Sequence, residues 1–186
     1  LTDAVMKIDQ EGVRPFLKAF SLVPRKIGRR HDGRPGNRSP LDAARHLLLM
    51  VIFERPSEPR FAAVDGLFRT ADDAEACFLY RELSLLPQPD RWVDRCRDGL
   101  RTNQLSVFRA ISRGDYAYRH LPDHAWNQLV LKAAFLGEPL REIVGLDSRR
   151  NRALGRMLGD YISEREAAGR PVPEDVATHA ALCLES

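Results

Sequence analysis

One segment, residues 122–137 (PDHAWNQLVLKAAFLG), constrains the fold more than any other part of this chain. Most of its residues are apolar, and a helix that is apolar on nearly all sides is usually buried. Pro122 suits the first turn of a helix, where its missing N–H would be unpaired anyway. Gly137 suits a left-handed C-terminal cap. The sequence therefore predicts a central, buried helix.

Three polar residues interrupt this helix at a spacing of four: His124, Gln128 and Lys132. This spacing places them on one face, with Trp126 and Asn127 beside them. Such a face either meets solvent at a groove or is satisfied by neighbouring helices. A buried lysine can act as a base, and a histidine can transfer protons. The alternative is that Lys132 pairs with a carboxylate of the last long helix and Trp126 belongs to the core.

Helical periodicity continues along the rest of the chain, and no alternating β pattern of useful length occurs. Ser39 is expected to cap one helix, with Leu47 and Leu48 in its core stripe, and Thr70 to cap the next. A change of direction is expected near residues 99–103, and residues 114–121 are predicted to form a loop. The predicted helices are 3–22, 40–54, 61–69, 71–86, 90–113, 122–137, 148–168 and 174–184.

These helices predict an all-α fold, a bundle or HEAT-like stack of about seven to nine helices. The 186 residues are 44% hydrophobic, which suits a single domain over residues 1–186. Residues 24–40 form a basic loop rich in Gly and Pro. This loop could bind an anion, but we favour a solvated loop.

Charge and composition exclude several classes of function. The net charge of +3 does not indicate a nucleic-acid-binding protein. No apolar run approaches about 18 residues, so no direct membrane insertion is expected. Three scattered cysteines and no signal pattern at the first residues favour a cytoplasmic location. Because the chain starts at Leu1 rather than Met, we expect that residues precede it.

Two further groups of polar residues are candidate sites. Asp160 and Glu164 follow Arg156 at a spacing of four, so they could act as acid and base or form a helix-surface ion pair. No third ligand accompanies them, so no metal site is expected. Asn103, near the bend, could line a polar cleft or satisfy backbone groups, and Tyr80 and Arg81 are further candidates. No cofactor is expected, because phosphate-binding and catalytic motifs are absent from the sequence.

Several segments resemble the EboA family. They are AWNQLVLKAAF (125–135), PLREIVGLDSRRNRALGRMLGDY (139–161), EREAAGRPV (164–172), LYRELSLLP (79–87), RTNQLSVFRAI (101–111) and PRKIGR (24–29). The resemblance implies a small, soluble, all-helical protein from a bacterial gene cluster for secondary metabolites. It also implies a role in handling metabolites across membranes, with scytonemin-type pigment precursors as one case.

The chain departs from the pattern of this family at three places. The family typically has His where this chain has Ser163, Trp where it has Glu166, and an Asn-Pro-Tyr-Pro-like loop in place of GDYAYR (114–119). A role that depends on the histidine, such as metal binding, is therefore not expected here. The changed loop precedes the central helix, which is compatible with a divergent member that handles a particular metabolite.

Three functions remain open. The first is binding of a hydrophobic or aromatic metabolite beside the central helix, with ligand contacts from Tyr116, Tyr118, Trp126, Asn127, Gln128 and Lys132. The second is a cofactor-free biosynthetic enzyme, a cyclase, isomerase or hydrolase, that uses His124, Lys132, Asp160 and Glu164 as acids and bases. The third is a helical adaptor for a partner from the same gene cluster, such as a membrane prenyltransferase.

Overall fold

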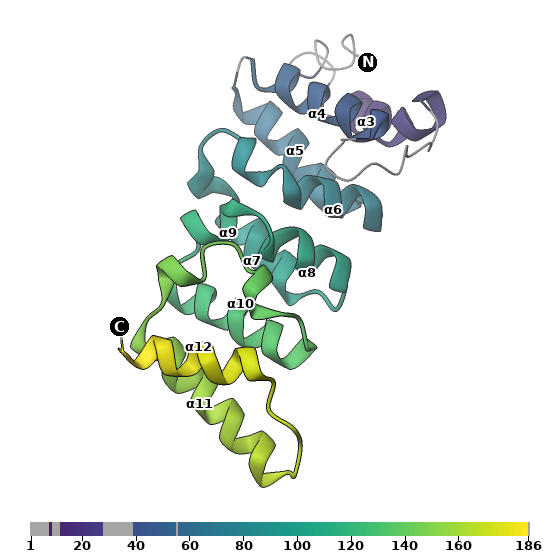
Figure 1. Ribbon diagram of the computed structural model, residues 1–186. Coiled ribbons are helices and arrows are strands. Elements are labelled where there is room, and N and C mark those ends of the chain that lie inside the picture. The colour runs from purple at the N-terminus through teal and green to yellow at the C-terminus, as the bar shows by residue number, and fades with distance from the viewer. Residues whose placement is uncertain (1–7, 9–11, 28–38, 55, 186) are drawn as a thin grey trace. The chain divides into compact units, whose positions relative to one another are not determined.

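The structure is a computed structural model that describes residue 8 and residues 12–27, 39–54 and 56–185 (Figure 1). All regular elements of these residues are α-helices or short 3₁₀ helices, so the prediction of an all-α fold is confirmed. They include ten α-helices, close to the expected number. The chain divides into two compact units, Leu1–Gln88 and Pro89–Ser186. A single domain over residues 1–186 stays a prediction.

The first unit contains four described α-helices and one 3₁₀ helix. They are α3 (Arg14–Ile27), α4 (Pro40–Ile52), α5 (Glu58–Thr70), α6 (Asp73–Arg81) and η1 (Leu83–Leu85). As predicted, Ser39 caps α4, and its Oγ accepts a hydrogen bond from the Asp42 amide at 3.0 Å. Arg45 is buried and forms a 2.9 Å ion pair with Glu75, which joins α4 to α6.

Four predictions for the first unit are wrong in detail. The helix expected over residues 3–22 is interrupted at Gly12, which has a positive φ of 79°: Ile8 is helical, and a separate helix, α3, starts at Arg14. Because α3 continues to Ile27, residues 24–27 of the predicted loop 24–40 are helical instead. Leu47, expected in the core, is 64% exposed. The cap of α6 is Asp72 rather than Thr70, because its carboxylate accepts the Glu75 amide at 2.8 Å. Residues 1–7 and 9–11, and 28–38 of the basic loop, lie outside the described residues.

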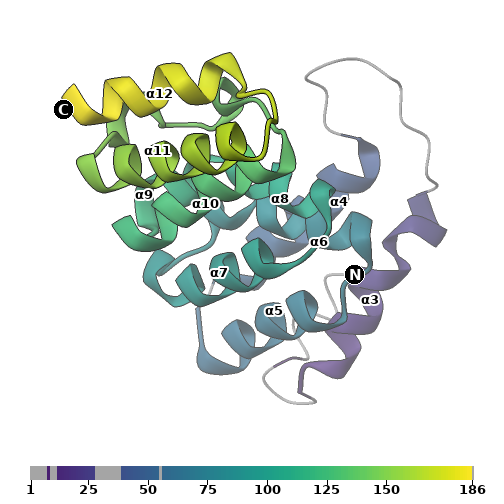
Figure 2. The same ribbon diagram turned by 90° about the horizontal axis from the view of Figure 1, so that it is seen from below.

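The second unit is built around α10 (Asp123–Leu136), which ends at Gly137 in the left-handed conformation, as predicted. Pro122 is the N-cap rather than the first helical residue. α10 packs against α11 (Arg152–Ala167), and α11 packs against α12 (Glu174–Glu185) (Figure 2). The remaining elements of this unit are η2 (Pro89–Trp92), α7 (Val93–Arg101), α8 (Leu105–Ser112), α9 (Asp115–His120), η3 (Leu140–Glu142) and η4 (Asp147–Arg149).

The loop predicted over residues 114–121 is a short helix, α9. Its Tyr118 ring lies directly against Gly145, which has a positive φ of 82°. The guanidinium of Arg149 donates hydrogen bonds to the carbonyls of Ala117 and Tyr118 at the end of α9. A cation at a helix C-terminus is favourable, because carbonyl oxygens there lack helical partners. These contacts with residues later in the chain stabilise the C-terminal end of α9, and the local sequence does not show them.

The inner face of α10 is held by aromatic and amide contacts. Trp126 is fully buried, and the Arg149 guanidinium carbon lies 5.0 Å from the centroid of its ring. The side-chain amides of Asn127 and Asn151 donate to each other, at 3.0 Å and 2.9 Å. Since these contacts fix the rotation of α10 about its axis, His124 and Gln128 lie on its outer, exposed face. No helix among the described residues is long and apolar enough to cross a membrane.

We predict that Gly145→Ala lowers the free energy of unfolding by about 3 kcal/mol, because the new methyl group would overlap the Tyr118 ring and alanine is strained at positive φ. Gly137→Ala is a matched control, since Gly137 also has positive φ but no atom lies within 4 Å of an added Cβ. Gly137→Ala should lower the free energy of unfolding by only about 1 kcal/mol, and urea denaturation measures both variants. Equal losses for the two variants would show that Tyr118 does not pack as described.

Candidate functional site

A pocket of about 320 Å³ lies between α7 and α10 in the second unit. The predicted polar stripe borders it, since His124, Gln128 and Lys132 occupy successive turns of α10 on the side that faces the pocket. The complete lining is Arg97, Leu100 and Arg101 from α7, and His124, Ala125, Gln128, Leu129 and Lys132 from α10. The central helix therefore forms one wall of a pocket large enough for a small ring system.

Lys132 joins α10 to the C-terminal end of α7. Its Nζ donates hydrogen bonds to the carbonyls of Leu100 and Thr102, the latter at 2.7 Å. The Phe108 ring centroid lies 5.8 Å from the same Nζ. The expectation that Lys132 pairs with a carboxylate of the last long helix is therefore wrong, because backbone carbonyls bind its ammonium group. Desolvation lowers the pKa of Lys132 from its ordinary value.

The rim of the pocket carries a concentration of positive charge. Arg97 and Arg101 are one helical turn apart on α7, and none of the eight lining residues is Asp or Glu. Each arginine forms an ion pair outside the lining, Arg97 with Asp94 at 3.3 Å and Arg101 with Asp98 at 2.9 Å. These pairs are exposed and span one turn of one helix, so they are weak and can rearrange around a ligand.

The inner surface of the pocket is apolar. Leu129 is almost completely buried, while Leu100 and Ala125 are partly exposed to the opening. Together with the charged rim, they produce a surface that suits a molecule with an apolar body and a negatively charged group. Apolar walls with a few convergent polar groups are typical of small-molecule sites.

Four predicted ligand contacts lie elsewhere in the second unit. Trp126 and Asn127 are on the buried side of α10. Tyr116 is buried, and its hydroxyl donates to the Pro89 carbonyl. Tyr118 packs against Gly145 and makes an edge contact with Trp126, with centroids 6.4 Å apart. None of these four residues lines the pocket between α7 and α10, so they are not part of this site.

The predicted acid and base residues are not brought together. Asp160 and Glu164 lie on the exposed surface of α11 and do not line the pocket that His124 and Lys132 border. Asn103 is exposed after α7 and is also outside the lining. In the first unit, Tyr80 is buried against Phe68, and Arg81 forms an exposed ion pair with Asp42. The four-residue acid–base set of the enzyme hypothesis is thus not assembled in one place.

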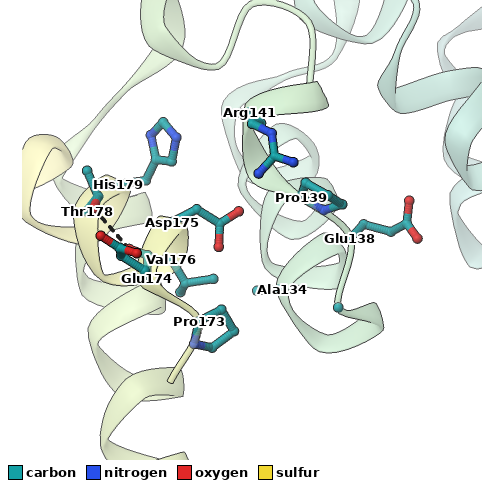
Figure 3. Close-up of a pocket in the computed structure, with 11 residues that line it drawn as sticks. Ala134, Glu138, Pro139, Arg141, Pro173, Glu174, Asp175, Val176, Thr178 and His179 are labelled. Carbon is teal, nitrogen blue, oxygen red and sulfur yellow. Dashed lines mark hydrogen bonds between the residues drawn. The ribbon is translucent and has the colours of Figure 1, made fainter. Parts of the chain in front are cut away.

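A second pocket in this unit, of about 450 Å³, lies between the end of α10 and the start of α12 (Figure 3). In Figure 3, the carboxylate of Asp175 and the guanidinium of Arg141 extend into it. Asp175 also accepts the Leu140 amide at 2.8 Å, and it thereby holds the turn after α10 against α12. Glu138 is bound by Arg109 at 2.6 and 2.7 Å, which lowers the pKa of Glu138. Asp175 and Glu138, two of the acidic residues that line this second pocket, therefore already have structural partners.

Sequence reasoning found the α10 wall but did not include Arg97 and Leu100 in the site. A signal was available, because Arg97 and Arg101 are spaced by four in a segment predicted to be helical. What the sequence could not supply was the pairing of α7 with α10, which depends on tertiary packing. No group of three metal-ligating side chains occurs within the residues that the structure describes.

Comparison with known protein families finds a match that covers most of the chain. The model of the family described as "Metabolite traffic protein EboA" matches residues 30–180, which include every residue of the pocket between α7 and α10. No curated protein and no solved structure matches the chain.

Replacement of Lys132 tests its structural role. We predict that Lys132→Met lowers the free energy of unfolding by about 1 to 2 kcal/mol, because the carbonyls of Leu100 and Thr102 lose their charged donor. Gln128→Met, one turn earlier on the same exposed face, should change it by less than about 0.5 kcal/mol. Urea denaturation measures both, and a larger loss for Gln128→Met would contradict the assignment.

Proposed function

Because the chain belongs to the EboA family of metabolite traffic proteins, we propose that it binds a small metabolite with an aromatic or aliphatic body and a negatively charged group. The binding site is the pocket between α7 and α10. The protein holds this compound without changing it and releases it to the next component of the pathway. The observation that supports this proposal best is that the lining contains three basic side chains, Arg97, Arg101 and Lys132, and no carboxylate.

The charged group of the ligand would interact with the guanidinium groups of Arg97 and Arg101, which suit planar, bidentate binding of a carboxylate. Lys132 uses hydrogen bonds to two carbonyls, which leaves one of its three donors for a ligand. Because desolvation disfavours its charge and no carboxylate balances it, an anion in the pocket would stabilise the ammonium form.

The body of the ligand would lie against Leu100, Ala125 and Leu129. Burial of apolar surface contributes roughly 25 cal/mol per Å², so a bicyclic ring system can gain several kcal/mol here before the entropic cost of binding. Reversible contacts of this kind suit a carrier, because a metabolite in transit has to leave its binding protein again.

Two small probes of nearly equal size test the proposal. We predict that 2-naphthoate binds at least about tenfold more tightly than 2-naphthamide, because only the carboxylate makes charge-assisted hydrogen bonds, which contribute about 1.5 to 3 kcal/mol. The double variant Arg97→Gln/Arg101→Gln should remove this preference and leave 2-naphthamide binding unchanged. Isothermal titration calorimetry measures the dissociation constants.

Arg156→Gln is the matched control, since Arg156 is an exposed helical arginine of the same unit that does not line the pocket. Ala125→Trp, which would fill the pocket, should weaken both probes. The proposal is wrong if neither probe binds, or if Ala125→Trp leaves both affinities unchanged. Equal affinity of the two probes, with loss of both in Ala125→Trp, would retain the site but reject an anionic ligand.

A further inference from the structure

The first unit has a pocket of its own, of about 270 Å³, where α4 meets the end of α6 and η1. It is lined by His46, Leu49, Met50, Phe53, Glu54, Glu82, Leu85, Leu86 and Pro87. We propose that this pocket is a second small-molecule site, which takes an uncharged aromatic compound with a hydroxyl group and binds that hydroxyl through His46. This proposal does not depend on the pocket between α7 and α10.

The polar part of the pocket is a histidine–carboxylate pair. Nδ1 of His46 lies 2.7 Å from Oε2 of Glu82, and the Glu82 side chain is only 7% exposed. An ionised carboxylate only accepts hydrogen bonds, so Nδ1 of His46 carries the hydrogen in this contact. When the ring is neutral, Nε2 is then its acceptor, and the contact with the carboxylate fixes the orientation of the ring and selects this tautomer.

The position of Glu82 is electrostatically unfavourable. It follows α6 directly as the C-cap residue, where the helix dipole disfavours negative charge. Burial of a carboxylate adds a further cost unless a donor compensates it. Nδ1 of His46 is one such donor, and the Glu82 carboxylate in turn orients the imidazole ring at the edge of the pocket.

The other ring nitrogen of His46 is accessible. Nε2 makes no hydrogen bond to the described residues, and it is not completely buried. The His46 side chain is 23% exposed and lines the pocket. A ligand hydroxyl that enters the pocket can therefore donate its hydrogen bond to Nε2.

The walls favour an aromatic body and disfavour an anion. Six of the nine lining residues are apolar, and two of them, Met50 and Leu85, are about half exposed, at 51% and 52%. Side chains of this kind gain contact area when an aromatic ring lies against them. The two carboxylates of Glu54 and Glu82 would repel a carboxylate ligand, which makes the preference opposite to that of the pocket between α7 and α10.

Calorimetry with the full chain and two uncharged probes tests the proposal. We predict that 2-naphthol binds about tenfold more tightly than 2-methoxynaphthalene, the ratio that one neutral hydrogen bond of about 1.4 kcal/mol gives. His46→Phe should bind both probes equally, because it keeps an apolar ring and lacks the acceptor. His124→Phe, a histidine of the other pocket, should retain the tenfold preference.

Leu85→Ala keeps the proposal testable if loss of His46 disturbs the fold, because Leu85 is exposed and its truncation leaves the histidine–carboxylate pair in place. It should weaken both probes by a similar factor of about three to ten and preserve their ratio. Arg97→Gln/Arg101→Gln should change neither affinity. The proposal is overturned if the wild type binds neither probe, binds them equally, or keeps full affinity for both after Leu85→Ala.

Discussion

The contacts on the inner face of α10 determine which of its residues can meet a ligand. Trp126 is enclosed between the core and the Arg149 guanidinium, and Asn127 exchanges two hydrogen bonds with Asn151. A rotation of α10 about its axis would break both contacts and bury an unpaired amide, which costs about 1 to 3 kcal/mol. The outer face, with His124, Gln128 and Lys132, is consequently held at the pocket.

Lys132 illustrates how one group can support both the fold and the site. Its hydrogen bonds to the carbonyls of Leu100 and Thr102 end α7 and fix that helix beside α10. The same bonds hold a positive charge next to Arg97 and Arg101 without a carboxylate to cancel it. The concentration of charge at the rim is therefore partly a result of the way in which α7 is capped.

The sequence predicts those features that follow from local periodicity. The apolar run 122–137, with polar residues every fourth position, correctly indicates α10 and the side of it that borders a pocket. It does not separate Trp126 from a ligand contact, because burial of an aromatic ring suits a core and a binding site equally. The helix α9 was missed because its contacts with Gly145 and Arg149 come from later in the chain.

Long-range pairing also explains what was missed in the first unit. His46 and Glu82 are 36 residues apart, and neither stands out in its own segment. Similarly, Leu47 fits the apolar stripe of α4 by its spacing, yet its side chain is exposed. Periodicity identifies a face of a helix, whereas the neighbours that cover this face are set by tertiary packing.

The pocket between α7 and α10 is lined by basic side chains, whereas the pocket of the first unit carries two carboxylates, so the two proposals together predict that the chain distinguishes compounds by charge. A co-crystal structure with 6-bromo-2-naphthoate tests the central claim most directly, because anomalous scattering locates the bromine atom. The account predicts bromine against Leu100 and Leu129, with the carboxylate at Arg97 and Arg101. Bromine in either of the other two pockets, or at no defined position, would contradict it.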